Sequence, residues 1–183
     1  MSEELLVRHC SPTLAGLKTG NMFTMSYKTK KDVNKDVRML NRILVPKGLR
    51  VLPLRYNKNR VLIYIYRPKQ LQKDLNNCYA CKILNKFGYN SSNPNQCIVQ
   101  LVKKLRCNED FPHEIGLFLG YPPEDVKGFI ENKAEHYKFT GLWKVYGDEA
   151  KAKKLFAQYK KCTAVYYDRW SKGKSIERLT VAV

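Results

Sequence analysis

The chain has 183 residues, of which 44% are hydrophobic and 11% aromatic, so it carries enough apolar side chains for a core and is not wholly disordered. Its 34 lysines and arginines outnumber its 16 acidic residues, which gives a net charge of +18. A charge of this size predicts attraction to polyanions or to an anionic surface and says nothing about the fold.

The first helix is predicted over residues 11–20. Ser11 is a typical N-cap residue, Pro12 suits the first helical position, and Gly20 is a typical residue at a helix end. A second helix is predicted over residues 32–44, because apolar residues recur there on one face at helical spacing. Those residues are Val33, Val37, Leu40 and Leu44.

A β-hairpin is predicted over residues 49–66. Its strands are residues 49–56 and 60–66, and its turn is residues 57–59. Both faces of the second strand are apolar, with Val61, Ile63 and Ile65 on one face and Leu62, Tyr64 and Tyr66 on the other. Such a strand is expected at the centre of a sheet and covered on both sides.

The rest of the chain is predicted to be mostly helical. Helices are expected over residues 68–87, from Pro94 onward, and over residues 111–119 and 123–130. A longer helix is expected after its cap at Asp148, with a buried stripe of Ala152, Leu155, Phe156, Tyr159, Cys162 and Tyr166.

The elements together predict an α+β fold, mostly helical around a small sheet that contains the hairpin of residues 49–66. Residues 179–183 alternate weakly and are expected to add an edge strand. Because no repeat, low-complexity tract or linker interrupts the chain, residues 1–183 are expected to form a single domain.

The start of the chain differs from an export signal. Residues 1–8 carry two glutamates where a secretory signal has basic residues followed by a long apolar run. The apolar stretch at residues 61–66 is too short to cross a bilayer. The six cysteines are therefore expected to be thiols rather than disulfides. These features predict a cytoplasmic, soluble protein with no membrane insertion.

Three phrases of the sequence carry a family resemblance. They are residues 8–21, residues 111–122 continued by 124–126, and residues 141–146, together with the strand end at 64–67. Over nearly the whole chain the sequence resembles the bacterial family known as domain of unknown function 3793. The resemblance implies a small, single-domain, cytosolic bacterial protein, and it implies no activity, cofactor or catalytic residue.

The first phrase puts a thiol beside a predicted helix start. A helix N-terminus favours a thiolate, and His9 or Lys18 would add positive charge, so Cys10 is a candidate nucleophile. The same amide groups would instead hold a phosphate-bearing small molecule. The candidate ligand-binding residues are His9, Ser11, Thr13, Lys18 and Asn21. The structural alternative is that Ser11 only caps a helix and Cys10 packs as a small apolar side chain.

The second phrase contains His113 beside Glu114, just after Pro112. A histidine next to a carboxylate suits acid–base catalysis, so both are candidate catalytic residues that we expect near Cys10. Residue 117 is leucine, which excludes the His-Glu-x-x-His metal motif. The structural alternative is that Glu114 favours a helix start and His113 is a cap or an exposed side chain.

A Cys-x-x-Cys segment spans Cys78 and Cys81, which is the spacing of a zinc half-site or a redox pair. No second such segment occurs, and Cys97 and Cys107 follow at irregular spacing. We therefore predict no metal site, and the sequence identifies no cofactor.

The basic residues form the largest functional signal. Lys35, Arg38 and Arg42 share one face of the second predicted helix, and Lys103 and Lys104 cluster on a later one. These five are candidate nucleic-acid-binding residues, because cations that neutralise phosphates release counterions. Several aromatic side chains would stack on bases if they were exposed: Tyr27, Tyr56, Tyr64, Tyr66 and Trp143. A lysine-rich solvated surface is the alternative.

The leading functional hypothesis is a non-enzymatic module that binds nucleic acid, another polyanion or a phosphate-bearing ligand. The alternative is a small cytosolic enzyme or ligand-binding protein whose pocket is built from the Cys10 and His113–Glu114 segments. A third possibility is a basic partner for an acidic protein.

Overall fold

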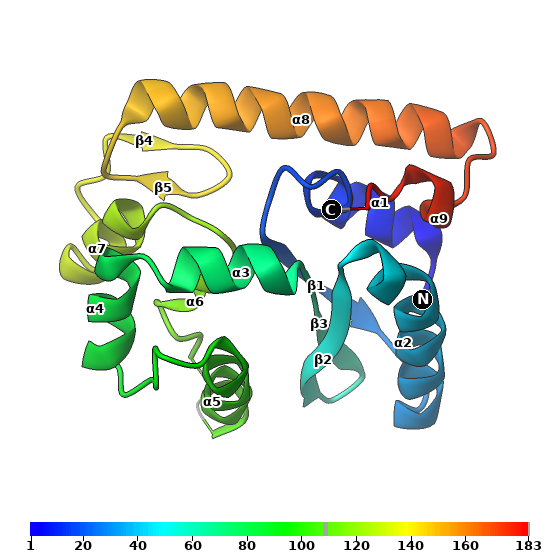
Figure 1. Cartoon of the computed structure of the whole chain (residues 1–183), viewed down its shortest axis with the longest axis horizontal. Coiled ribbons are helices and arrows are strands. Elements are labelled where there is room, and N and C mark those ends of the chain that lie inside the picture. Colours follow the sequence, from blue (N-terminus) through cyan, green and yellow to red (C-terminus); the bar gives the residue numbers. More distant parts are fainter. Residues whose placement is uncertain (108–109, 183) are drawn as a thin grey trace. The chain divides into compact units, whose positions relative to one another are not determined.

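A computed structural model describes residues 1–107 and 110–182. The chain divides into two compact units (Figure 1). Unit 1 is Met1–Gln70 with Tyr159–Val183, and unit 2 is Leu71–Gln158. The divisions fall within two helices, α3 (Pro68–Leu75) and α8 (Glu149–Ser171). Helices with a small antiparallel sheet confirm the predicted α+β class.

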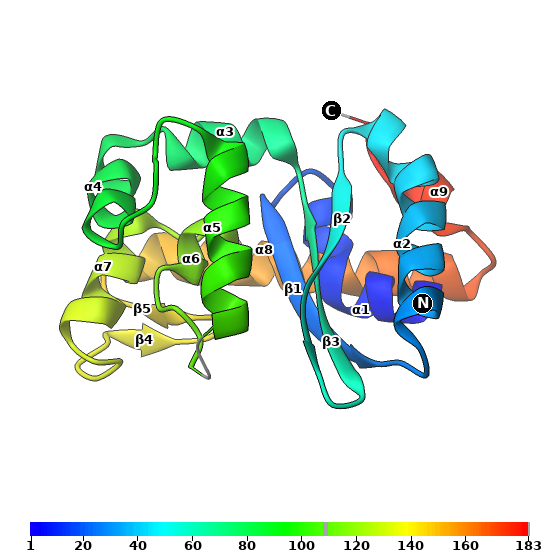
Figure 2. The same cartoon turned by 90° about the horizontal axis from the view of Figure 1, so that it is seen from below.

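Unit 1 contains a three-stranded sheet of order β1-β3-β2, in which both neighbouring pairs are antiparallel (Figure 2). The strands are β1 (Gly20–Ser26), β2 (Arg50–Asn57) and β3 (Arg60–Tyr66). The predicted hairpin is confirmed, and its second strand is central with both sets of side chains buried after Arg60. Strand β1 was not predicted. It forms because residues 20–26 pair along the free edge of β3.

The first helix lies earlier in the chain than predicted. Helix α1 is Glu3–Leu14, and Ser2 is its N-cap, with a side chain that accepts a hydrogen bond from the amide of Leu5. Glu3 and Glu4 occupy the first turn, where the helix dipole favours acidic residues. Pro12 therefore lies near the end of α1 and not at a helix start.

Helix α2 (Lys30–Leu44) confirms the second predicted helix. Thr29 caps it, and a short 3-10 helix, η1 (Val45–Lys47), continues it. Gly48 ends this segment at a φ of 81°, a left-handed conformation that glycine adopts without strain. The chain then enters β2.

The C-terminal segment was predicted as an edge strand, and this prediction is wrong for the described residues. Helix α9 (Ile176–Leu179) occupies its start, and residues 180–182 are not in a strand. The amide of Val181 donates to the carbonyl of Leu14, so the end of α1 binds this segment in place of a sheet edge. Val183 lies outside the described residues.

The core of unit 1 lies between its helices and one face of β3. Val61, Ile63 and Ile65 supply that face. Apolar residues pack against it from α1, α2, α8 and α9, among them Leu6, Leu14, Val33, Leu40, Tyr166 and Ile176. The apolar stripe predicted for α2 is buried as expected.

Arg67 directly follows β3, and its buried guanidinium binds backbone carbonyls from three other segments. Its Nε donates to the carbonyl of Thr13 at 2.8 Å, and its Nη2 donates to those of Leu14 at 2.9 Å and Val181 at 2.8 Å. Its Nη1 donates to the carbonyl of Lys47 at 3.3 Å. The carbonyls of Thr13 and Leu14 also accept the amides of Gly16 and Val181, so Arg67 adds a charged donor to oxygens at the end of α1, where the helix itself supplies few.

Unit 2 is mainly helical, with α4 (Cys78–Lys86), α5 (Pro94–Cys107), α6 (Ile115–Phe118) and α7 (Pro123–Glu131). Two short strands, β4 (Phe139–Thr140) and β5 (Lys144–Val145), form an antiparallel pair before α8.

Two predicted helices of this unit differ from the structure. The helix expected over 68–87 is split into α3 and α4, because the side chain of Asn77 accepts the amides of Tyr79 and Ala80 and caps a new helix. The helix expected over 111–119 is reduced to α6. Asp148 accepts the amide of Lys151, as expected of the cap of α8. Among the described helices, none has the length and apolar composition needed to span a bilayer.

Replacing Arg67 by methionine should lower the free energy of unfolding by about 3 kcal/mol, because four charge-assisted hydrogen bonds to backbone carbonyls would be lost from a buried position. Arg67→Lys should lose less, since an ammonium keeps the charge but lacks the planar fork. Urea unfolding followed by circular dichroism measures both changes.

Arg8→Met is the matched control, because Arg8 forms an exposed pair with Glu4 on α1. Its free energy of unfolding should change by less than about 0.5 kcal/mol. A stability of Arg67→Met equal to that of the control would show that the four carbonyl bonds contribute nothing net.

Candidate functional site

The Cys10 segment lies in the second half of α1, which changes its electrostatics. The predicted helix start at Ser11 is wrong, because α1 begins at Glu3 and ends at Leu14. The end of a helix presents carbonyl oxygens and negative partial charge, which disfavour a thiolate or a bound phosphate. The amide groups expected to hold an anion here already donate hydrogen bonds inside α1. They therefore do not form the predicted anion site.

Cys10 is fully buried in the core of unit 1, and burial raises the pKa of its thiol to about 12. Lys18 is also buried, and burial lowers the pKa of its ammonium to about 8, although the nearby Cys10 acts in the opposite direction. Both shifts favour the uncharged forms. The structure thus gives Cys10 the environment of a packed thiol, and its predicted catalytic role stays a prediction.

The other predicted ligand-binding residues of this segment contact one another or the core. Ser11 donates its hydroxyl to the carbonyl of Val7 within α1. Thr13 donates to the side-chain oxygen of Asn21 at 2.8 Å. The ring of His9 stacks on that of Phe23, with centroids 5.4 Å apart. Burial first, and then the neighbouring charge of Arg8, lower the pKa of His9.

Glu114 is buried in unit 2 and accepts two hydrogen bonds on Oε1. The hydroxyl of Tyr89 donates at 2.9 Å and the ammonium of Lys104 at 3.2 Å. Burial first, and then Glu114, raise the pKa of Tyr89. Lys104 also donates to the carbonyl of Phe87 at 2.8 Å. Lys104 was predicted as a surface contact for phosphate, but it is already engaged by these oxygens.

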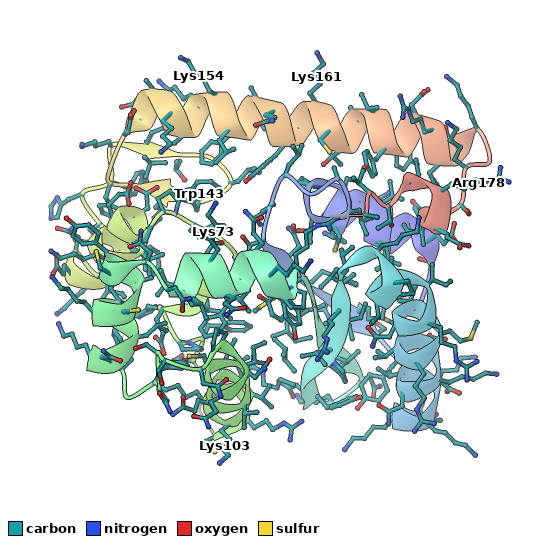
Figure 3. The ribbon with its side chains drawn as sticks, viewed as in Figure 1. Lys73, Lys103, Trp143, Lys154, Lys161 and Arg178 are labelled. Carbon is teal, nitrogen blue, oxygen red and sulfur yellow. The ribbon has the colours of Figure 1, made fainter. Side chains whose placement is uncertain are left out.

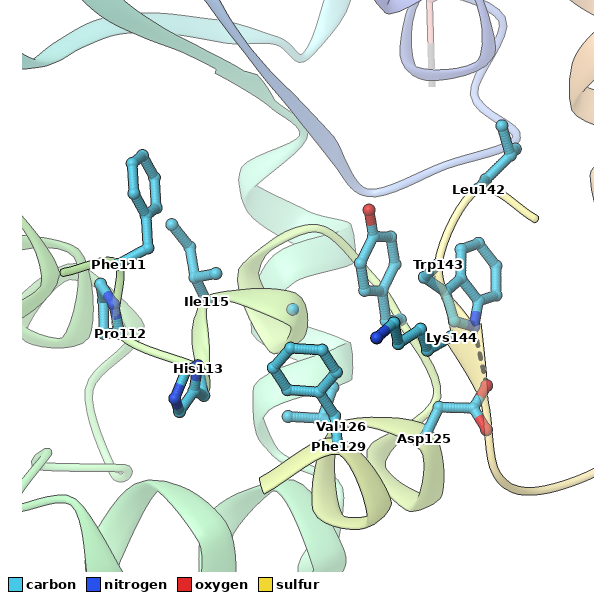
Figure 4. A pocket seen from close by; sticks show the side chains of 12 residues that line it. Phe111, Pro112, His113, Ile115, Asp125, Val126, Phe129, Leu142, Trp143 and Lys144 are labelled. Carbon is cyan, nitrogen blue, oxygen red and sulfur yellow. Dashed lines mark hydrogen bonds between the residues drawn. The ribbon is translucent and has the colours of Figure 1, made fainter. Parts of the chain in front are cut away.

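His113 is exposed beside this network. Its ring meets the ring of Phe129 nearly edge-on, with centroids 5.3 Å apart. It lines a cavity of about 330 Å³ together with Phe129 and Trp143 (Figure 4). It also lines a second cavity of about 490 Å³, which includes Glu114 and Lys104. His113 and Glu114 thus line the same second cavity, and their predicted catalytic roles stay predictions.

Cys10 belongs to unit 1, whereas His113 and Glu114 belong to unit 2. The structure describes the surroundings of each residue within its own unit. The predicted proximity of Cys10 to His113 and Glu114 therefore stays a prediction.

The cysteines of unit 2 are separate thiols. All six cysteines of the chain are free, and Cys78 is exposed in the first turn of α4. Cys81 donates its thiol to the carbonyl of Leu75 at 3.0 Å. Within residues 1–107 and 110–182, no cluster of three or more His, Cys, Asp or Glu side chains is arranged to hold a metal ion.

The outer face of α2 carries a row of cations that we call the α2 cationic stripe. It consists of Lys31, Lys35, Arg38 and Arg42, all of them exposed. Their spacing aligns them along the helix, opposite the buried stripe that begins with Val33. At a rise of 1.5 Å per residue, the stripe is about 16 Å long.

The two acidic residues of α2 have partners of their own. Asp32 accepts the hydroxyl of its N-cap Thr29 at 2.7 Å, and Asp36 pairs with the terminal amine of Met1. Neither lies in the line of the cations, because both fall on the flank of the helix between the two faces. The stripe therefore keeps a uniform positive charge.

The aromatic side chains expected to stack on bases are unsuited to it. Tyr64, Tyr66 and Trp143 are buried. Tyr27 and Tyr56 are half-buried and pack edge to face, with ring centroids 5.4 Å apart. None of these five rings is exposed, so their placement does not favour the predicted stacking on bases.

Sequence reasoning missed the residues that shape the cavity beside His113. Tyr121, Asp125 and Trp143 all lie in phrases that carried the family resemblance, but none of them was assigned to a cavity. A buried Asp125 bound to the indole of Trp143 has no local sequence signal, because 18 residues separate the two. The concentration of aromatic residues in these phrases was the available clue.

These features define an α+β protein with an exposed cationic helix face in unit 1 and an aromatic-lined cavity in unit 2. The chain belongs to the family described as "Protein of unknown function (DUF3793)", which it matches over residues 6–180. This match confirms the resemblance found in the sequence. No curated protein and no solved structure matches the chain.

Cys10 should resist alkylation in the native protein, whereas the exposed Cys78 and Cys107 should react first. The physical reason is that burial both blocks the reagent and keeps Cys10 protonated. Iodoacetamide labelling followed by peptide mass spectrometry reports all six cysteines, and labelling in denaturant is the control. Faster native labelling of Cys10 than of Cys78 would restore the nucleophile hypothesis.

Relative to the wild type, Lys18→Met should be more stable at neutral pH than at pH 10.5. The folded-state pKa of Lys18 is lowered from 10.5 to about 8, so folding opposes its charge at pH 7 by on the order of 3 kcal/mol. This cost is full below pH 8 and disappears as the pH rises to 10.5, where the unfolded chain also loses the proton.

The difference in unfolding free energy between Lys18→Met and the wild type should therefore shrink between pH 8 and 10.5. Denaturant unfolding across this range measures it, with the exposed Lys35→Met as the control. If the difference in unfolding free energy did not change with pH, burial of the Lys18 ammonium would not oppose folding.

Proposed function

We propose that this protein binds nucleic acid through the α2 cationic stripe, electrostatically and without catalysing a reaction. The observation that supports the proposal is the alignment of four exposed cations opposite the buried face of α2, while both acids of the helix are engaged elsewhere. We also propose that the protein is cytoplasmic and bacterial, which the family resemblance and the sequence features support.

Cations in a row suit a phosphate backbone better than a small anion. Each phosphate neutralised releases condensed counterions, so several aligned contacts add their effects. The stripe offers charge but no exposed ring for stacking, and Arg and Lys at this spacing carry no code for base edges. The proposed binding is therefore to the backbone and independent of base sequence.

The net charge of +18 supports the same proposal at longer range. A strongly positive protein attracts a polyanion before contact and speeds association at low salt. Lys103 adds an exposed cation on α5 of unit 2, where it extends away from the helix (Figure 3). Lys104 adds none, because Glu114 neutralises it.

Binding to a short fluorescein-labelled DNA duplex should weaken steeply with salt. Four phosphate contacts give a slope of about −3.6 in a plot of log K against log salt concentration. Replacing Lys35, Arg38 and Arg42 together by glutamate should lower the affinity by about tenfold or more at low salt, and it should reduce the slope to about −0.9. Fluorescence anisotropy across a salt series measures both quantities.

A matched control reverses three exposed lysines of α8, Lys154, Lys160 and Lys161, two of which extend outward in Figure 3. It changes the net charge equally but leaves α2 intact. The control should keep most of the salt slope. Equal losses in the two variants would assign binding to net charge alone, and an absence of binding at low salt would refute the proposal altogether.

A further inference from the structure

The cavity beside His113 is enclosed by three segments of unit 2. They are residues 111–116 leading into α6, residues 121–129 at α7, and residues 142–144 at β5. Figure 4 shows Phe111, His113 and Ile115 on one side and Trp143 on the other, with Val126 and Phe129 between them. The volume of about 330 Å³ is at the lower end of the range for small-molecule sites.

The Trp143 wall is fixed before any ligand arrives. The indole nitrogen donates to Oδ2 of Asp125 at 2.8 Å. The ring of Tyr121 stacks on the indole with centroids 4.5 Å apart, and the ring of Phe156 meets it edge-on at 4.4 Å. A preformed aromatic wall lowers the ordering cost of binding a flat molecule.

Asp125 is the acidic residue among the described lining residues, and its oxygens are already occupied. Oδ1 accepts the amides of Tyr146 and Gly147, each at 2.8 Å, while Oδ2 holds Trp143. A buried carboxylate that already accepts three hydrogen bonds has its negative charge largely balanced by donors, so it attracts a cationic ligand less than a bare carboxylate would. Asp125 is thus a positioning residue for the Trp143 wall.

Two further polar side chains of the lining, His113 and Lys144, carry nitrogen donors. His113 is exposed at the cavity and offers ring nitrogens there. Lys144 is half-buried, and its ammonium donates to the carbonyl of Ala134 at 2.7 Å and lies 4.8 Å from the ring centroid of Tyr137. The rest of the lining is apolar or aromatic, so the cavity pairs flat carbon surfaces with donors and positive charge.

We propose that this cavity binds a planar aromatic small molecule that carries an anionic group. Its rings lie against the side chains of Trp143, Phe129 and Val126, and its anion faces His113 and Lys144. The site is separate from the α2 cationic stripe, because the cavity belongs to unit 2 and the stripe to unit 1. Neither site requires the other.

Three probes separate the two halves of this proposal: 2-naphthoate, its neutral analogue 2-naphthalenemethanol, and the non-aromatic cyclohexanecarboxylate. Isothermal titration calorimetry on the full chain should show that 2-naphthoate binds at least about tenfold more tightly than either of the others. That factor is what one charge-assisted hydrogen bond, or the aromatic contact, is worth.

The location of binding is read from the two tryptophans, Trp143 and Trp170. With 5-fluorotryptophan incorporated, the fluorine resonance of Trp143 should shift as 2-naphthoate is added, while that of Trp170, which packs on the core of unit 1, should not. A Trp170→Phe variant assigns the two resonances.

His113→Leu tests the anion contact without touching the Trp143 wall. It should weaken 2-naphthoate about tenfold and leave 2-naphthalenemethanol unchanged. His136→Leu, which alters a highly exposed histidine of the same unit, is the matched control and should change neither affinity. Circular dichroism checks that both variants are folded.

Failure of 2-naphthoate to bind, or a shift of the Trp170 resonance alone, would overturn the proposed site. Equal binding of the naphthoate and the neutral alcohol would overturn the anionic preference, and equal binding of cyclohexanecarboxylate would overturn the aromatic preference. Equal weakening by His113→Leu and His136→Leu would remove His113 from the site.

Discussion

The buried guanidinium of Arg67 is the interaction on which unit 1 depends, because the ends of its segments meet there. The central strand ends next to it, and it donates to carbonyl oxygens of α1, of η1 and of Val181, which lies two residues after α9. Burying a positive charge is costly unless it is well bonded. Here the last carbonyls of α1 supply both the acceptors and the negative end of a helix dipole. Arg67 therefore requires α1 to end where it does, which also fixes the electrostatics around Cys10.

Unit 2 uses a buried charge of opposite sign in a similar way. The carboxylate of Asp125, on α7, accepts hydrogen bonds from residues on both sides of β5, Trp143 before it and Tyr146 and Gly147 after it. It thereby joins a helix to a chain reversal that has little regular structure. Gly147 supplies one of these amides. Its position also favours glycine, because a Cβ there would lie 2.6 Å from Cγ of Glu124. The same contacts that close this part of the fold hold Trp143 at the cavity. Structure and candidate site are thus not separable in unit 2.

The predicted sites differed in how much of their character the sequence carried. The α2 cationic stripe followed from periodicity alone, because an amphipathic helix that buries Val33 and Leu40 must present Lys35 and Arg38 outward. The environments of Lys104 and Cys10 were harder to predict from the sequence, because they depend on partners from elsewhere in the chain. Glu114 neutralises Lys104, and the core of unit 1 encloses Cys10. Residue type suggested a nucleophile at Cys10 and a phosphate contact at Lys104. The neighbours of each side chain in the fold disfavour both roles.

The sequence by itself determined the α+β class, the hairpin with its central strand, the apolar face of α2 and the excess of positive charge, because these depend on local periodicity, turn residues and composition. The sequence also identified the family to which the chain belongs. Only the tertiary structure decided where α1 ends, that residues 20–26 form β1, and that residues 180–182 do not join the sheet. Those outcomes depend on pairing with β3 and on Arg67, contacts between residues as far apart as 67 and 181. The cavity at Trp143 was decided in the same way, because its walls are joined by bonds that no local pattern of residues encodes.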